Sequence, residues 1–168
     1  MNDQPKIQSL EELYDACKTQ IYTLCRRLTG EKALADDLFS ETWVKVAEKQ
    51  GNIRRNGNPR AWVYTVCINL YRKSGAHRMH RVEHENFSGQ EAFEANAEES
   101  LIEQEQSRAL RKALAGLDDK YRIPLILFYF RDLSYEDIAR IMKLPMSTVK
   151  YRLNQAKKLL KKEMEELK

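Results

Sequence analysis

The segment from residue 146 to residue 163 carries polar side chains of types that recognise nucleic acid. If the segment is a helix, one of its faces presents hydroxyl, amide and cationic groups. Between residues 143 and 162 there are seven Lys and Arg and no acidic residue. Amides and guanidinium groups hydrogen-bond to base edges in the major groove of DNA, and ammonium groups neutralise phosphate. We therefore expect DNA contacts from Ser147, Tyr151, Asn154, Gln155 and Lys158, flanked by Thr148, Lys150 and Arg152.

The opposite face of this segment is apolar and must be buried. Its apolar residues recur at i, i+4, i+7 and i+11, which at about 100° per residue lie on one side of a helix. They are Val149, Leu153, Ala156 and Leu160. A simpler interpretation is a solvated basic helix that packs on a helical domain.

A second, shorter helix is predicted immediately before this one. Ser134 can cap the backbone N–H of Asp137. Pro145 then interrupts the helical pattern, because it lacks the N–H and clashes with the preceding turn. Ser147 is a suitable cap for the following helix. The apolar stripe of the first helix consists of Ile138, Ala139, Ile141 and Met142. The pair predicts a helix-turn-helix, a DNA-binding arrangement.

Composition favours an all-α fold in one domain or two small ones. The chain has 168 residues, 42% of them apolar and 32% charged, with only six Gly and four Pro. No stretch approaches the ~18 continuous apolar residues that a membrane span needs, so we expect a cytoplasmic protein without membrane insertion. The three cysteines, Cys17, Cys25 and Cys67, lack CxxC spacing and are predicted to be reduced core residues.

Charge is unevenly distributed along the chain. Residues 1–82 carry a net charge of +5, residues 83–105 carry −8 and residues 106–168 carry +7. Two basic blocks that flank an acidic connector are typical of two nucleic-acid-facing domains joined by a linker. We expect a first domain at 1–82, an acidic linker at 83–104 and a second domain at 105–168. The apolar run 121–130 is interpreted as a buried helix opened by Pro124.

A second nucleic-acid face is predicted in the first domain. Between residues 49 and 82 there are eight Lys and Arg and no acid. After a loop rich in Gly and Asn, Pro59 is suited to the first position of a helix that should run to about His80. One side of it carries Trp62, Thr65, Asn69, Arg72 and Lys73, and single-stranded DNA binds to such combinations of aromatic and cationic groups. The alternative is that Trp62 is a core residue.

The preceding helix, expected from Glu31 to Lys49, carries an acidic patch. It consists of Asp36, Asp37 and Glu41. These acids either favour the amino-terminal half of the helix through its dipole or dock a basic partner.

Three histidines raise the possibility of a metal site. His77, His80 and His84 could share a helical face, but no carboxylate or thiolate lies nearby in the sequence and Arg78 and Arg81 disfavour a cation. We expect phosphate contacts, no metal and no cofactor. A metal-dependent nuclease built from these histidines and the acidic patch remains the enzymatic alternative, although no general-base motif is recognisable.

Four stretches in order resemble one protein family over nearly the whole chain. They are ADDLFSETWVKV, NPRAWVYTVCINLYRK, LDDKYRIPLILFYFRDLSYEDIARIM and LPMSTVKYRLNQAKKLLK. Together they resemble the extracytoplasmic-function sigma factors of the bacterial RNA polymerase sigma-70 family. Two positions depart from common family patterns: Ser40 stands where Gln is frequent, and Ser147 where Gly is frequent.

The resemblance implies a non-enzymatic polymerase subunit that recognises the −10 and −35 promoter elements, often under control of an anti-sigma factor. Polymerase contacts are implied for Asp36, Asp37, Leu38, Glu41 and Trp43. Contacts to the −10 element are implied for Asn56, Asn58, Arg60, Trp62, Asn69, Arg72 and Lys73. In the −35 element, base contacts are implied for Lys150, Tyr151, Asn154 and Gln155, and phosphate contacts for Thr148, Arg152 and Lys157. The alternative is a helix-turn-helix repressor or activator, which would leave the first basic block without a role.

Overall fold

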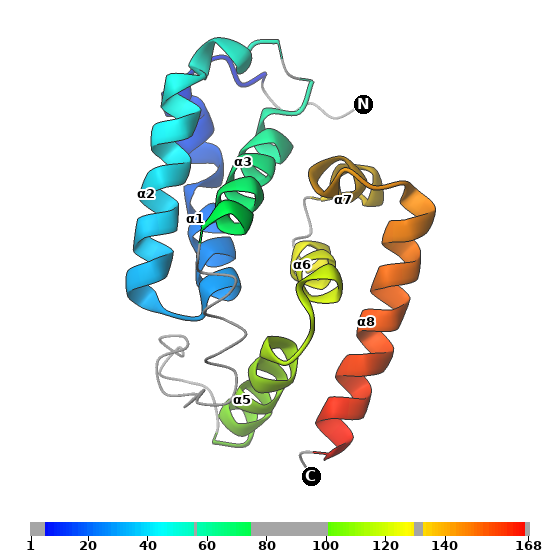
Figure 1. Ribbon diagram of the computed structural model, residues 1–168. Helices are drawn as coiled ribbons and strands as arrows, with labels where there is room; N and C mark the ends of the chain where they lie inside the picture. The colour runs from blue at the N-terminus through cyan, green and yellow to red at the C-terminus, as the bar shows by residue number, and fades with distance from the viewer. Residues whose placement is uncertain (1–5, 56, 75–100, 130–132, 167–168) are drawn as a thin grey trace.

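The protein is all-α. The computed structural model describes residues 6–55, 57–74, 101–129 and 133–166, with the backbone alone for 101–107, and contains no strand in these ranges (Figure 1). The helices of the first half are α1 (Leu10–Thr29), α2 (Lys32–Glu48), the short η1 (Gln50–Asn52) and α3 (Pro59–Lys73). Those of the second half are α5 (Leu101–Ala115), α6 (Asp119–Phe128), α7 (Tyr135–Met142) and α8 (Met146–Glu166).

The helix boundaries follow local sequence signals. Ser9 accepts a hydrogen bond from the backbone N–H of Glu12 at the start of α1, and Gly30 ends that helix with φ of 70°. Pro59 is the first residue of α3, as predicted, and the side chain of Asn58 caps it. These signals work because helix ends leave backbone donors and acceptors without intrahelical partners.

Two boundaries differ from expectation. α3 ends at Lys73, not near His80, because Ser74 adopts an extended backbone and its hydroxyl donates to the Tyr71 carbonyl at 2.7 Å. α6 begins at Asp119, five residues before the Pro124 that was expected to open it. A proline at this internal position removes only one backbone donor, and that donor would have bonded a carbonyl in the first turn.

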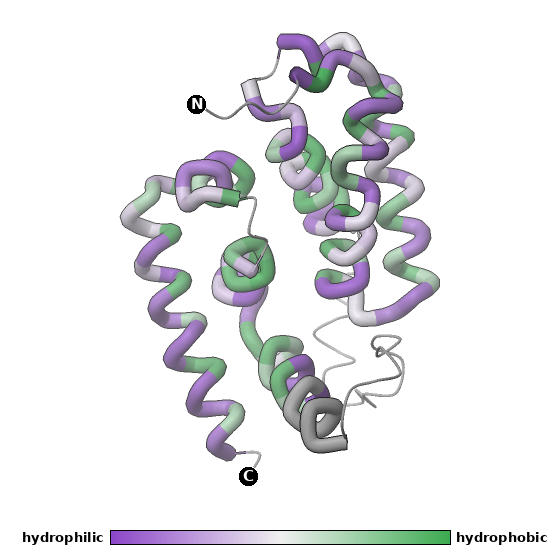
Figure 2. Tube along the Cα trace, turned by 180° about the vertical axis from the view of Figure 1, so that it is seen from behind, coloured by the Kyte–Doolittle hydropathy of each residue, from purple (hydrophilic) through white to green (hydrophobic). Residues whose placement is uncertain are grey.

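The hydrophobic core extends across both halves of the chain. In the first half α1, α2 and α3 pack together around Leu13, Ile21, Leu28 and Val63, all with no exposed area. In the second half α6, α7 and α8 pack together, while α3 contacts α7 and α1 contacts α6. Figure 2 shows apolar residues on the facing sides of the helices and hydrophilic residues outside. None of the described helices is long and apolar enough to cross a membrane.

Candidate functional site

The predicted helix-turn-helix is present. α7 starts with a reciprocal capping box, in which the backbone N–H of Asp137 donates to Ser134 Oγ and that of Ser134 donates to Asp137 Oδ2, both at 3.0 Å. The turn uses Lys143 in the left-handed conformation, with φ of 56°. α8 then begins at Met146, so Ser147 is not its cap. The Pro145 carbonyl instead accepts the first helical bond, from the Val149 N–H at 3.1 Å.

The two faces of α8 are separated as predicted. Val149, Leu153, Ala156 and Leu160 are buried, with at most 7% of their surface exposed. On the other side Tyr151 is 60% exposed. Of the predicted DNA-contacting residues, the exposed ones are Ser147, Lys150, Tyr151, Asn154, Lys157 and Lys158, and the half-buried ones are Thr148, Arg152 and Gln155. The arrangement presents hydroxyl, amide and cationic groups on a rigid helix that is anchored through its apolar stripe.

The polar stripe of α3, which consists of Trp62, Thr65, Asn69, Arg72 and Lys73, lies in a different environment from the polar face of α8. Asn58 Oδ1 accepts from the Ala61 N–H at 3.1 Å, and Asn58 Nδ2 donates to Asp137 Oδ1 of α7 at 3.0 Å. Trp62 and Asn69 are half-buried, whereas Arg72 is exposed. The remaining predicted contacts of this group are Arg60, which is half-buried, Lys73, which is exposed, and Asn56, which lies outside the described residues.

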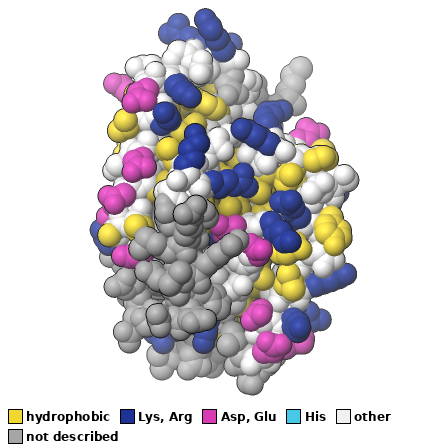
Figure 3. Space-filling view, in the orientation of Figure 1, with side chains coloured by type: hydrophobic (Ala, Val, Ile, Leu, Met, Phe, Trp, Pro, Cys, Tyr) yellow, Lys and Arg dark blue, Asp and Glu magenta, His cyan; other side chains and the backbone are white. Residues whose placement is uncertain are grey.

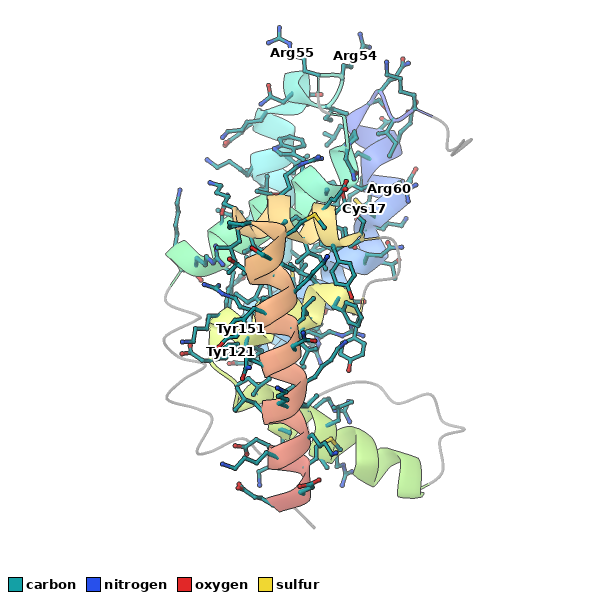
Figure 4. The ribbon with its side chains drawn as sticks, turned by 90° about the vertical axis from the view of Figure 1, so that its right-hand side faces the viewer. Cys17, Arg54, Arg55, Arg60, Tyr121 and Tyr151 are labelled. Atoms are coloured by element: carbon teal, nitrogen blue, oxygen red, sulfur yellow. The ribbon has the colours of Figure 1, made fainter. Side chains whose placement is uncertain are left out.

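Two exposed arginines were not singled out from the sequence. Arg54 and Arg55 lie between η1 and α3, and Figure 4 shows both at one end of the molecule, pointing away from the helices. Arg54 Nε donates to the Gln8 carbonyl at 3.4 Å. The sequence feature that marks these two arginines is the basic loop in which they lie. Helical periodicity selects residues of helices and therefore did not identify residues of this loop. This pair extends the basic surface of α3 towards that end.

The acidic patch of α2 divides into internally bonded and exposed carboxylates. Asp36 accepts a hydrogen bond from Lys32 Nζ at 3.0 Å and one from the Tyr22 hydroxyl at 2.8 Å. Both bonds lower the pKa of Asp36, and the bond from Lys32 has the larger effect. Asp37 and Glu41 are exposed one turn apart. Acidic side chains line the edge of the molecule formed by α2, while basic side chains gather over the region of α3 (Figure 3).

Aromatic side chains adjoin this acidic patch. Tyr14 of α1 packs edge-on against Trp43 of α2, with ring centroids 4.9 Å apart, and Phe39 lies 6.3 Å from Trp43. Trp43 Nε1 is buried without a hydrogen-bond partner among the described residues. Leu38, predicted as a polymerase contact, is only 5% exposed and belongs to the core.

Buried thiols and metal ligands form no site in the described part of the chain. Cys17, Cys25 and Cys67 are buried and not disulfide-bonded, as predicted. Cys25 and Cys67 have their sulfur atoms 3.7 Å apart, and this hydrogen bond together with burial raises the pKa of the Cys25 thiol. No group of three potential ligands that could hold a metal ion occurs in the described ranges. The predicted histidines, 77, 80 and 84, lie outside them.

Comparison with known proteins matches both halves of the chain to one family. Residues 13–77 match Sigma-70 region 2, and residues 107–160 match Sigma-70, region 4. RNA polymerase sigma factor YlaC of Bacillus subtilis is 31% identical over 93% of this chain and 92% of its own length. ECF RNA polymerase sigma factor SigW of the same species is 25% identical over 93% and 89%.

A solved structure has the same fold. The sigma factor RpoE of Bartonella quintana, determined in complex with the anti-sigma factor NepR, superimposes with a TM-score of 0.73. It covers 95% of this chain and 98% of its own, at 24% identity. The fold and the two matched regions define the class as a two-part, all-α transcription initiation factor.

The chain belongs to the extracytoplasmic-function sigma factors of the RNA polymerase sigma-70 family. Sigma factors direct transcription initiation by binding core RNA polymerase and promoter DNA, and are non-catalytic. This confirms the family predicted from the four sequence stretches.

Proposed function

We propose that three surfaces of this sigma factor, on α2, α3 and α8, have separate roles in transcription initiation. α2 binds core RNA polymerase, α3 engages the melted −10 element and α8 enters the major groove of the −35 element. The observation that carries the proposal is the polar face of α8, which is exposed opposite a buried apolar stripe on a capped helix-turn-helix. Major-groove recognition requires such a rigid helix with free hydrogen-bonding groups.

The residue assignments follow from exposure and chemistry. On α8, Tyr151, Asn154 and Gln155 contact bases and the flanking cations contact phosphates. On α3, Trp62 stacks on an unpaired base while Arg72 and Lys73 hold the backbone. On α2, Asp37 and Glu41 face a basic polymerase surface. The functional units are 1–82 and 105–168, joined by the acidic segment 83–104.

Partners and location follow from the same assignment. Polymerase supplies the catalysis, so this chain is not an enzyme and needs no cofactor, and it acts in the cytoplasm where the polymerase is. The fold shared with a sigma factor that was solved bound to its anti-sigma factor supports control by such a partner. That partner would cover the faces of α2, α3 or α8.

Substitution of Gln155 tests the α8 assignment. Gln155→Ala should weaken recognition of the −35 element by about 1–3 kcal/mol, because a good bidentate base contact is lost. Transcription from promoters selected by the wild type should fall accordingly. Run-off transcription on single-position promoter variants measures the loss and locates the base. Lys161→Ala, which changes an exposed residue of the same helix outside the proposed interface, should leave the promoter profile unchanged. An unchanged profile for Gln155→Ala would remove this residue from the recognition face.

A further inference from the structure

A cation lies over an aromatic ring where α6 meets α8. The ammonium of Lys157 on α8 lies 4.4 Å from the centroid of the Phe128 ring, at the end of α6. The face of an aromatic ring carries partial negative charge, so it attracts an ammonium within about 6 Å of its centroid. Phe128 is half-buried and Lys157 is exposed, so the pair lies at the protein surface. The contact therefore restrains one positive charge beside the polar face of α8.

The Phe128 ring is itself held in place by its surroundings. Residues 125–127, which precede it on α6, have no exposed area and anchor the end of this helix in the core. Two further rings pack against Phe128. The ring of Tyr129 lies 6.1 Å away at an interplanar angle of 67°, and that of Tyr135 on α7 lies 6.0 Å away at 30°. The ring that holds the cation is therefore supported by α6 and α7, whereas the cation belongs to α8.

Lys157 lies at one edge of the proposed DNA-binding face. It follows Lys150 by seven residues, nearly two helical turns, so both lysines lie on the same side of α8, about 10.5 Å apart along its axis. The exposed Asn154, three residues before Lys157, is its neighbour on the polar face. When a helix lies in the major groove, its centre faces base edges and its flanks face the phosphates of the groove walls. An ammonium at this edge is therefore suited to a backbone phosphate.

An ammonium that lies over a ring can still bind a phosphate. Lysine has three N–H donors, and the ring face takes up only one direction, so donors remain for oxygen acceptors. A lysine that rotates freely in solvent loses rotamer entropy when it binds a phosphate. A lysine that already lies over a ring has lost part of that freedom on folding. The ring thereby lowers the entropic cost of the phosphate contact without contacting DNA itself.

We propose that Phe128 is a positioning residue for promoter binding, whose ring holds the Lys157 ammonium in place for a backbone phosphate of the −35 duplex. The inference rests on the proposed function, because it requires that α8 binds the −35 element. Phe128 acts through Lys157 and contacts no base. It therefore contributes to the affinity for promoter DNA and leaves the preferred −35 sequence unchanged.

Nuclear magnetic resonance of the free, full-length chain tests the position of the ammonium. Protons above an aromatic ring are shielded, so the ε-methylene protons of Lys157 should resonate upfield of those of Lys158, its exposed neighbour. Phe128→Leu keeps an apolar side chain but removes the ring, and should move the Lys157 resonance to the position of Lys158. Phe128→Tyr retains the ring and should retain the upfield shift. Coincident Lys157 and Lys158 resonances in the wild type would overturn the inference.

Promoter affinity of the holoenzyme tests the role of the ring. The chain is combined with core RNA polymerase, and fluorescence anisotropy measures binding to a labelled promoter fragment, selected by the wild type in run-off transcription, at several KCl concentrations. Lys157→Met should lower the slope of log affinity against log salt by about 0.9, because one phosphate contact is lost. Phe128→Leu should lower affinity about two- to fivefold. Phe128→Tyr should bind as the wild type does.

A double-mutant cycle separates positioning from general destabilisation. In a Lys157→Met background, Phe128→Leu should have no further effect on promoter affinity, because the ring acts through that ammonium. Lys161→Met is the matched control background, since it removes an exposed cation one turn further along α8. There Phe128→Leu should keep its full two- to fivefold effect. Circular dichroism verifies that each variant retains its helices.

The outcomes separate failure of this inference from failure of the proposed function. An equal loss of affinity from Phe128→Leu in the wild-type and Lys157→Met backgrounds indicates a structural role and refutes positioning. Promoter-specific binding that is insensitive to Phe128→Leu also refutes the role of the ring, while the assignment of α8 stands. Wild-type holoenzyme without promoter-specific binding refutes the assignment of α8, and the inference with it, even where the Lys157 resonance is shifted.

Discussion

Single residues of the same type have different roles according to their bonding. Asp36 and Asp37 are neighbours in sequence, but only Asp36 is bonded to Tyr22 and Lys32. Asp37 projects into solvent and is the better candidate for a partner contact. Among basic residues, Arg122 is buried and bonds backbone carbonyls, whereas Lys150 on α8 is exposed. Charge alone therefore does not identify the interface.

Tyr71, whose hydroxyl accepts a hydrogen bond from Arg122 at 2.6 Å, sets an alkaline limit on the stability of the fold. Burial raises the pKa of Tyr71 to about 12, whereas an unfolded tyrosine titrates near 10. The fold therefore favours the neutral phenol, and this stability is complete below pH ~10 and lost as the pH rises to ~12. Urea denaturation across this range should show a steeper loss for the wild type than for Tyr71→Phe. Tyr151→Phe, at an exposed tyrosine, is the control, and parallel curves for wild type and Tyr71→Phe would contradict the expectation.

Residue-level prediction from the sequence succeeded where periodicity governs. The stripe of Val149, Leu153, Ala156 and Leu160 is buried as predicted because a 3.6-residue repeat fixes which side chains share a face. Arg122 was missed, because its burial depends on carbonyls more than 90 residues earlier in the chain. Its only local signal was a basic residue within an apolar run.

At the scale of elements, helix existence was predictable and some boundaries were not. The cap at Ser134 is local and acts as expected, and Ser9 and Gly30 bound α1 through equally local signals. α3 ends early and α6 starts early because Ser74 and Asp118 adopt an extended backbone. The residue types at these two positions do not by themselves require that conformation. Which face of α3 is covered by α7 depends on tertiary packing and has no local signal.

A substitution on α2 tests the proposed contact between this helix and core RNA polymerase. Asp37→Arg should lower affinity for core RNA polymerase, because it reverses the charge of an exposed carboxylate on the proposed interface and introduces like-charge repulsion. Fluorescence anisotropy with core polymerase measures this, and the effect should diminish at high salt. Glu165→Arg makes the same charge reversal on exposed α8 and should leave affinity unchanged. Equal affinities for wild type and Asp37→Arg would exclude this position from the interface.

At the scale of the whole molecule, the two halves of the chain are packed on each other. The matched regions at residues 13–77 and 107–160 belong to one family and occur in the order expected from the sequence. The core joins them through α1, α3, α6 and α7.

The most direct test of the account is transcription by purified components. The full-length chain should co-elute with bacterial core RNA polymerase and direct run-off transcripts from specific sites in a genomic fragment pool, with shared sequences near −10 and −35 upstream of each start. Core polymerase alone should give none of these transcripts. Tight binding to duplex DNA with neither co-elution nor transcripts would contradict the account and favour a repressor or activator.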